Sequence, residues 1–280
     1  MIELVPAGRM SDGAGRKVRF AFVVTLAALA GVGALLWASA SPERRLTAQR
    51  GPGPGVDALV HRRVALGRSV HGRPIFAVAL GDPDAPRKLL VVGAIHGNET
   101  AGIAIARDLE SSAPPRQSLL WVIRDLNPDG VAASTRQNAH GVDLNRNFPW
   151  RWRHLEHRGG LQYSGPRALS EPESRLARAL ILRIRPRITI WFHQPLGVVD
   201  ESGGDIRVER RFARIVGLPP TRLRRYPGSA ASWQDRRLRG STAFVVELPP
   251  GKPSPSLLTR STGAIRRLGG APTAPRQRHF

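Results

Sequence analysis

The 280-residue sequence predicts an α/β fold: one domain with a mixed, centrally buried β-sheet flanked by helices. Several short apolar runs are continuous rather than alternating, which is typical of strands that are buried on both faces of a sheet. Helical patterns separate these runs along the chain, as expected for strands that alternate with helices. An apolar helix at the N-terminus is expected to precede the domain.

The first forty residues predict an export signal. Basic residues at 16–19 precede an uncharged run at 20–38, and Ala38-Ser39-Ala40 fits a signal cleavage site. The run is also just long enough to cross a bilayer, so a cleaved signal peptide and an uncleaved membrane anchor both remain open. Both predict an extracytoplasmic protein, either secreted or periplasmic, or anchored to the cytoplasmic membrane. Met1 and Met10 are both compatible with this signal as the start of translation.

The folded domain is predicted over residues 57–268. Residues 41–56 are rich in Pro, Gly and charge and predict a flexible linker, while 269–280 predict a disordered tail. The chain has no cysteine, which excludes disulfides, thiol catalysis and cysteine-type zinc sites. Any metal must therefore be held by His, Asp and Glu.

The charge of the chain favours anionic partners. With 43 basic and 21 acidic residues, the formal net charge is +22. Such a chain would adhere to an anionic cell-wall surface or to acidic membrane lipid. The basic residues are scattered over the whole sequence and form no single motif, so no nucleic-acid partner is expected.

The first half of the domain predicts a hairpin, a buried strand and a helix. Residues 59–65 and 74–80 predict two short strands that turn at His71-Gly72. Residues 88–95 (KLLVVGAI) form a nearly continuous apolar run and predict a strand buried on both faces. Residues 99–109 follow with helical periodicity.

The second half predicts three more buried strands and a long helix. Residues 118–126 predict a strand that the turn at 127–130 (NPDG) ends. Residues 172–184 predict a helix with glutamates near its N-terminus, where the helix dipole favours them. Residues 187–192 and 243–248 predict the last two strands, and functional sites in such sheets form where strands end.

Three of the buried strands carry a reactive side chain at their ends. The strand at 88–95 runs into His96 and Glu99, the strand at 187–192 runs into His193, and the strand at 243–248 contains Glu247. A His-x-x-Glu pair alone is usually chance or packing, but a strand-to-helix loop can direct both side chains at one point. Two His and one Glu leave a fourth zinc position open, which is the arrangement of catalytic zinc.

The segment at 141–149 (GVDLNRNFP) carries a family resemblance. Together with His-x-x-Glu, the NPDG turn and FVVELP at 244–249, it resembles the zinc carboxypeptidase family, the carboxypeptidase A-like metallopeptidases. The resemblance covers about residues 89–249, and the motifs stand in the family's order. It implies a zinc carboxypeptidase-like fold, one Zn²⁺ per chain and hydrolysis of peptide bonds.

The resemblance assigns a role to each matching residue at the metal. His96, Glu99 and His193 match the zinc ligands, and Asp143 matches the carboxylate that orients the first histidine. Glu247 matches the general base, which takes a proton from water and passes it to the leaving amine. A glutamate in an apolar strand is an unusual structural choice unless it is paired, because burying a lone carboxylate is costly.

Four further residues match the family's substrate contacts. Arg136 matches the arginine that stabilises the oxyanion, and Asn145 with Arg146 matches the pair that binds a substrate carboxylate. Tyr226 lies near the position of the substrate-capping tyrosine, although the sequence around it does not align cleanly.

The remaining histidines are not expected to bind metal. His154 and His157 form a competing His-x-x-His pair, but they lie in a polar, arginine-rich loop. The other four are expected to face solvent: His61, His71, His140 and His279.

Several departures indicate a particular branch of the family. Asn98 stands where digestive-type members have arginine, Gln194-Pro195 follows the second histidine ligand, and the tyrosine stands in the string YPGS. With the short domain, these features look more like the bacterial murein tripeptide amidases. That resemblance implies cleavage of the bond between γ-D-glutamate and meso-diaminopimelate in cell-wall peptides (muropeptides).

Other functions remain open on the sequence. An ordinary metallocarboxypeptidase would trim peptide C-termini with the same residues, and a substrate panel separates it from an amidase. A non-catalytic cell-wall-binding protein would share the fold, but every chemical position is filled here. The related deacylases of small acylated amino acids lack the LNRNFP motif that this chain has, so that function is less expected. A nucleic-acid binder would show an affinity for DNA that depends on salt and does not change with chelators.

Overall fold

A computed structural model describes residues 58–270 of the chain. The predicted export signal, the linker at 41–56 and the tail from residue 271 lie outside the described residues. No helix within 58–270 has both the length and the hydrophobicity that crossing a membrane requires.

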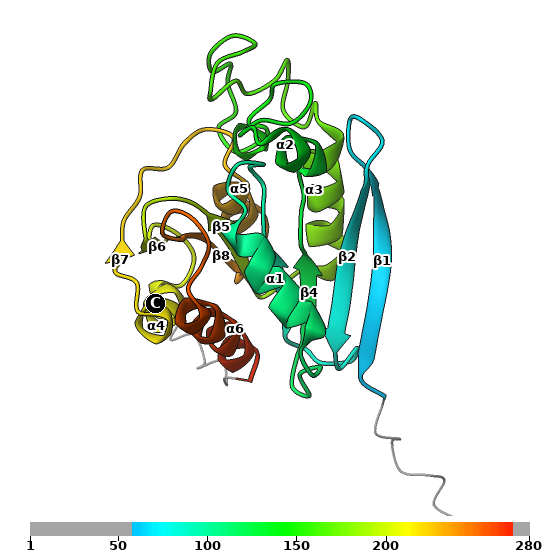
Figure 1. The fold of residues 1–280 in the computed structure, drawn as a ribbon, viewed down its shortest axis with the longest axis vertical. Coiled ribbons are helices and arrows are strands. Elements are labelled where there is room, and N and C mark those ends of the chain that lie inside the picture. The colour runs from blue at the N-terminus through cyan, green and yellow to red at the C-terminus, as the bar shows by residue number, and fades with distance from the viewer. Residues whose placement is uncertain (1–57, 271–280) are drawn as a thin grey trace, which may run out of the picture. The chain divides into compact units, whose positions relative to one another are not determined.

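A mixed sheet of eight strands forms the centre of the described region, in the order β1-β2-β4-β3-β5-β8-β6-β7 (Figure 1). The four middle strands β4, β3, β5 and β8 are mutually parallel, whereas β1, β2 and β6 pair in antiparallel fashion. This confirms the predicted mixed sheet. The strands are β1 (Val60–Arg68), β2 (Pro74–Gly81), β3 (Lys88–Val92), β4 (Leu119–Ile123), β5 (Ile188–His193), β6 (Val198–Asp200), β7 (Pro220–Thr221) and β8 (Thr242–Glu247).

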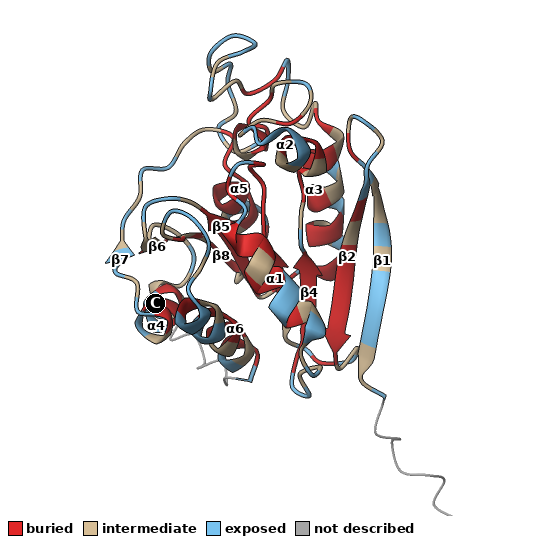
Figure 2. Cartoon of the chain, viewed as in Figure 1, coloured by how far each residue is buried: buried red, intermediate tan, exposed pale blue. Residues whose placement is uncertain are grey.

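Helices cover both faces of the sheet, and this explains why the middle strands are apolar throughout (Figure 2). Side chains of a strand alternate between its faces, so Leu89 and Val91 enter one core while Leu90 and Val92 enter the other. The first core is completed by α1 (Ala101–Ser111), α4 (Ile206–Val216) and α6 (Pro255–Gly270). The second is completed by α3 (Pro172–Ile184) and α5 (Ala230–Arg237).

The predicted hairpin is present, with β1 and β2 antiparallel and a turn from Ser69 to Arg73. The helix predicted at 172–184 matches α3. Several bounds differ from the prediction. The first strand runs on to Arg68, and β4 ends at Ile123 rather than at residue 126. The third strand ends at Val92 rather than at residue 95, and α1 begins at Ala101 rather than at residue 99. The last helix continues to Gly270, two residues beyond the predicted domain end.

The NPDG segment was predicted as a simple turn, but it opens the short helix α2 (Pro128–Ala133). Asn127 is the N-cap, and its side-chain oxygen accepts a hydrogen bond from Gly130 N at 3.0 Å. Proline is favoured in the first turn of a helix because its missing N–H would have no partner there. The same residues that indicate a turn in the sequence, Asn127 and Pro128, therefore start a helix in the structure.

The early end of β3 creates the loop at 93–100 that carries His96 and Glu99. This loop packs closely on α2: a Cβ placed on Gly97 would lie 1.9 Å from the carbonyl carbon of Gly130. Only glycine permits that approach, so Gly97 sets the position of the two reactive side chains around it. The carboxyl ends of β3, β5 and β8 meet at the same edge of the sheet, where sites in such folds form.

Candidate metal centre

Three buried side chains direct one atom each at a common point. The Nδ1 atom of His193 lies 3.1 Å from His96 Nδ1 and 2.9 Å from Glu99 Oε2, and His96 Nδ1 lies 2.9 Å from the same oxygen. Ligands of a tetrahedral zinc ion at about 2.0–2.1 Å lie roughly 3.3 Å from one another. The observed triangle is close to that size, and two nitrogens with one carboxylate oxygen are a zinc donor set, so these residues fit a zinc ion.

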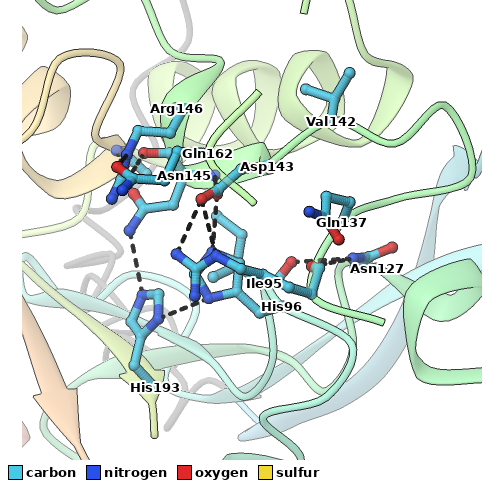
Figure 3. Close-up of polar contacts among 12 residues, drawn as sticks. Ile95, His96, Asn127, Gln137, Val142, Asp143, Asn145, Arg146, Gln162 and His193 are labelled. Carbon is cyan, nitrogen blue, oxygen red and sulfur yellow. Dashed lines mark hydrogen bonds and ion pairs between the residues drawn. The ribbon is translucent and has the colours of Figure 1, made fainter. Parts of the chain in front are cut away.

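Asp143 orients the first of these histidines (Figure 3). Its Oδ1 atom lies 2.9 Å from His96 Nε2, and the aspartate is fully buried. A proton on Nε2 is shared with this carboxylate, which leaves the lone pair of Nδ1 free toward Glu99 and His193. Asp143 is itself placed as the N-cap of the 3₁₀ helix η1 (Leu144–Arg146).

Arg136 joins two carboxylates of the centre. Its Nη1 atom donates to Glu99 Oε1 at 2.9 Å, and its Nε and Nη2 atoms donate to Asp143 Oδ2 at 3.0 and 2.9 Å. The arginine therefore occupies one oxygen of Glu99 and leaves the other to face the histidines. It also lines the cavity described below.

The electrostatics keep Glu99 and Asp143 ionised at neutral pH. Burial acts to raise the pKa of Glu99, but hydrogen bonds and charge from His193 and His96 hold that pKa far below its usual range. Burial likewise opposes the ionisation of Asp143, yet His96 and Arg136 keep its pKa well below the ordinary value. Glu99 is thus held as a carboxylate, the form that can bind a divalent cation, and Asp143 as the carboxylate that pairs with His96.

Glu247 lies beside the triad at the end of β8. Its register partner on the parallel strand β5 is His193, and it lines the same cavity as His96 and Glu99. Its Oε2 atom is buried and has no hydrogen-bond partner among the described residues. A buried carboxylate oxygen without a partner, next to a metal donor set, is available to bind water or substrate.

Asn145, Arg146 and Tyr226 line the same cavity, which measures about 340 Å³. The Arg146 guanidinium lies over the Tyr226 ring, 4.3 Å from its centroid, and its Nε atom donates to Gln162 at 3.2 Å. The amide nitrogen of Asn145 lies 3.5 Å from His193 Nε2 (Figure 3). The structure therefore brings all three predicted substrate-binding residues to the metal donors.

The loop with Tyr226 reaches the cavity because of a glycine. Gly228 has a φ of +77°, and a Cβ there would lie 1.9 Å from the carbonyl oxygen of Arg146. Glycine adopts this backbone conformation readily and leaves room for the contact. The YPGS string thus places the tyrosine against the arginine, although it aligned poorly by sequence.

Gln194 holds the centre together in a way that the sequence did not reveal. Its backbone N–H donates to Glu99 Oε2 at 3.2 Å, and its side-chain oxygen accepts from Ala101 N at 2.9 Å. Its side-chain nitrogen donates to the carbonyls of Pro249 and Gly251 at 2.8 and 2.9 Å. The sequence marked this position only as a departure from the family pattern.

The remaining histidines in the described part of the chain lie away from the centre. His154 and His157 are exposed, as are His61, His71 and His140, while His279 lies outside the described residues. Within residues 58–270, His96, Glu99 and His193 form the single group of three potential metal-binding side chains.

Comparisons with known proteins agree with this geometry. The family model described as zinc carboxypeptidase matches residues 59–195. Murein peptide amidase A of Escherichia coli K12 is 32% identical over 199 residues, which covers 66% of this chain and 80% of that protein. Carboxypeptidase Z of Homo sapiens is 37% identical over 122 residues, 33% of this chain and 19% of that protein.

Two solved structures share the fold. The murein-tripeptide amidase of Escherichia coli O157 superposes with a TM-score of 0.63 at 27% identity, over 77% of this chain and 96% of that one. Thrombin-activatable fibrinolysis inhibitor gives a TM-score of 0.64 at 16% identity, over 75% and 68% of the two chains. At that low identity, the second similarity concerns the fold alone.

Proposed function

This chain belongs to the zinc carboxypeptidase family of peptide-bond hydrolases, and on that premise we propose that it hydrolyses an amide bond in cell-wall peptides. The proposed bond joins γ-D-glutamate to meso-diaminopimelate. The identity to murein peptide amidase A over 80% of that protein's length supports this substrate class. The observation that carries the proposal is the meeting of the His-Glu-His donor set with the unpartnered oxygen of Glu247 in one cavity.

His96, Glu99 and His193 would hold one Zn²⁺, which when bound supplies Lewis acidity for the scissile carbonyl and lowers the pKa of water. Asp143 keeps the His96 ring in the orientation and protonation state that binding requires. Arg136 and Gln194 fix both oxygens of Glu99 from the opposite side. The chain thus prepares the ligands before any ion arrives.

Glu247 is the proposed general base. Its free Oε2 atom would take the proton of the attacking water and return it to the leaving amine. The residue lies at the end of a central strand, so its backbone is held by pairing on both sides, with His193 and with Val198. Such rigidity keeps the carboxylate in reach of the reacting atoms.

Arg146 and Asn145 are the proposed anchor for the free carboxylate on the leaving residue, because a guanidinium fork suits that geometry. Tyr226 would cover the bound substrate from the Arg146 side. Arg136 has five N–H donors and uses three on Glu99 and Asp143. Its remaining donors can stabilise the negative charge that develops on the carbonyl oxygen.

The proposed location is outside the cytoplasm, beside the cell wall. The N-terminal run at residues 20–38 supports export, with the segment either cleaved or retained as an anchor. The net charge of +22 would favour adhesion to an anionic wall.

Release of diaminopimelate from L-Ala-γ-D-Glu-meso-diaminopimelate tests the proposal. The zinc-loaded protein should cleave this tripeptide, and both a chelator and Glu247→Gln should abolish cleavage. Cleavage of ordinary peptide C-termini alone would assign the same site to a general metallocarboxypeptidase. Zinc binding without any cleavage would favour a cell-wall-binding protein.

A further inference from the structure

Arginine precedes every one of the four parallel strands, at the end of the sheet opposite the candidate metal centre. The segments that lead into β3, β4, β5 and β8 (82–87, 112–118, 185–187 and 238–241) contain Arg87, Arg116, Arg185, Arg187 and Arg239. Arg187 and His193 stand at the two ends of β5, so their backbones lie roughly 20 Å apart at about 3.3 Å per residue. We call the end of the sheet that carries these five arginines the amino-end face.

The positive charge of the amino-end face is not neutralised by the chain. None of the five arginines forms an ion pair within residues 58–270. Arg87 donates to an uncharged acceptor, Gly269 O, at 3.0 Å. Burial lowers the pKa of the Arg87 guanidinium, and repulsion from Arg187 and Arg211 lowers it further. The acidic residues of the four segments are Asp82 and Asp84.

A cavity of about 530 Å³ opens at this face, where Lys88 begins β3. Its basic residues include Arg62, Lys88 and Arg183, and its apolar residues include Trp121 and Ile184. No acidic side chain of the described region lines it. A cavity with both cationic and apolar residues fits a molecule that joins an anionic head group to hydrocarbon, such as a phospholipid. A sugar-phosphate polymer of the wall would use the charges but not the apolar residues.

The chain enters the domain at the same face. Val60, the first residue of β1, pairs with Gly81, which pairs with Leu119, and Leu119 pairs with Lys88. Figure 1 shows the start of β1 at the end of the sheet away from α2, on which the loop with His96 and Glu99 packs. The predicted linker at 41–56 therefore joins the predicted signal or anchor to this face. A flexible linker of 16 residues has a root-mean-square length of only about 22 Å, so it keeps the face near whatever holds residues 20–38.

We propose that the amino-end face binds the surface of a membrane that contains acidic phospholipids, with a lipid phosphate at Arg62, Lys88 and Arg183. The metal centre, at the other end of the parallel strands, would then face away from the membrane and toward the cell wall. The inference rests on the proposed location outside the cytoplasm and is independent of the proposed reaction.

Fluorescence quenching on the full-length chain tests this orientation. The chain has no cysteine, so Gln117→Cys beside Arg116 and Ala132→Cys on α2 can each carry a single fluorophore. The vesicles contain a lipid with a nitroxide on its head group, in phosphatidylcholine alone or with roughly a quarter phosphatidylglycerol. The ratio of quenching at 117 to quenching at 132 should be at least about twofold higher in the acidic vesicles. An equal ratio in the two kinds of vesicle would overturn the inference.

Two sets of substitutions that remove the same charge locate the interaction. Replacing Arg62, Arg116 and Arg183 together by Gln should remove the increase in the quenching ratio. The matched control replaces three exposed arginines of the loop before α3 by Gln, and it should keep the increase. These control residues are Arg153, Arg158 and Arg167. An increase that persists in the first variant, while circular dichroism shows it folded, would contradict the proposed face.

Salt and a soluble polymer complete the test. Sodium chloride at about 0.5 M screens charges beyond a few ångströms, so it should return the wild-type ratio to its value in neutral vesicles. A ratio that resists salt would overturn the inference even if the triple variant fails to fold. A spectral shift at position 117 with poly(glycerol phosphate), but not with acidic vesicles, would assign the face to a wall polymer instead. None of these measurements needs zinc or turnover, so they stand whether or not the proposed reaction does.

Discussion

Glu247 and His193 are register partners at the carboxyl ends of two adjacent parallel strands, β8 and β5. The distance between the proposed base and one proposed metal ligand is therefore set by the hydrogen-bonded sheet rather than by a loop. In that position Glu247 contributes an oxygen that has no hydrogen-bond partner within residues 58–270, whereas His193 contacts both other donors.

Replacing Glu247 by Gln should abolish turnover and leave metal binding intact. The amide cannot take up a proton, and general-base catalysis contributes roughly 10²–10⁴-fold to such reactions. We expect kcat to fall by at least about 10²-fold, with one zinc per chain retained by elemental analysis. Glu110→Gln at the end of α1 is the matched control. Loss of zinc from Glu247→Gln would show that the residue serves the metal instead.

Removing the metal should destabilise the protein as well as inactivate it. The buried donors His96, Glu99 and His193 fit an ion, and because they meet only in the folded chain, the unfolded chain would bind that ion far more weakly. A ligand that binds only the folded state, at about 100 times its Kd, adds roughly 2.7 kcal/mol of stability. Thermal melts with zinc and with a chelator measure the difference. An unchanged Tm, together with full activity in chelator, would contradict zinc binding here.

Gln194→Ala should weaken zinc binding. The Gln194 side chain bonds Ala101 N at the start of α1 and the backbone carbonyls that follow β8. Without these bonds, the Gln194 backbone N–H that donates to Glu99 would be held less firmly. Changes next to metal ligands typically cost 10–100-fold in affinity, so a loss on the order of tenfold is expected. Competition with a chromophoric chelator gives the affinity. Gln117→Ala, exposed before β4, is the control, and equal affinities in both variants would refute this role.

Glu209→Gln should change how stability depends on pH. The pKa of Glu209 is raised from 4.5 to about 8, first by burial and then by Asp200 and Asp235. Between these values the folded chain binds the extra proton, so the free energy of unfolding falls as pH rises. The fall is at most about 1.4 kcal/mol per pH unit for one group, and it ends above pH 8.

The glutamine carries no such proton. The free energy of unfolding of the variant, relative to that of the wild type, should therefore rise between pH 5 and pH 8. Urea denaturation at each pH measures the difference. A constant offset between the two proteins across this range would show that Glu209 ionises normally.

The sequence predicted the central strands, and it predicted the three side chains that the structure brings together at the candidate metal centre, because both depend on local patterns. Strands β3, β5 and β8 are nearly all apolar, and a reactive side chain follows or ends each one. The bounds of α3 were predicted because Pro172 starts the helix and its apolar period is regular. The roles of the individual site residues stay proposals that the experiments above address.

Other elements were missed for two different reasons. Helix α4 has a readable signal, with Asp205 as N-cap, Phe212 and Val216 on the apolar face and Gly217 after its end. Its many arginines obscured that pattern. Helix α5 is short and polar, so it offered no periodicity. Part of the cavity could not be predicted from the sequence, because Asp200 on β6 and Asp235 on α5 line the same cavity only once β6 has paired with β8.

The donor set is assembled from distant parts of the chain. His96 and Glu99 stand in one loop, but His193 joins them only after β5 has paired with β3. During synthesis, the first two residues are therefore exposed to any passing ion as a weak bidentate pair, and full affinity arrives with folding. On the proposed assignment, zinc capture would report that the sheet has closed, and it would serve as a readout of correct folding for variants of this chain.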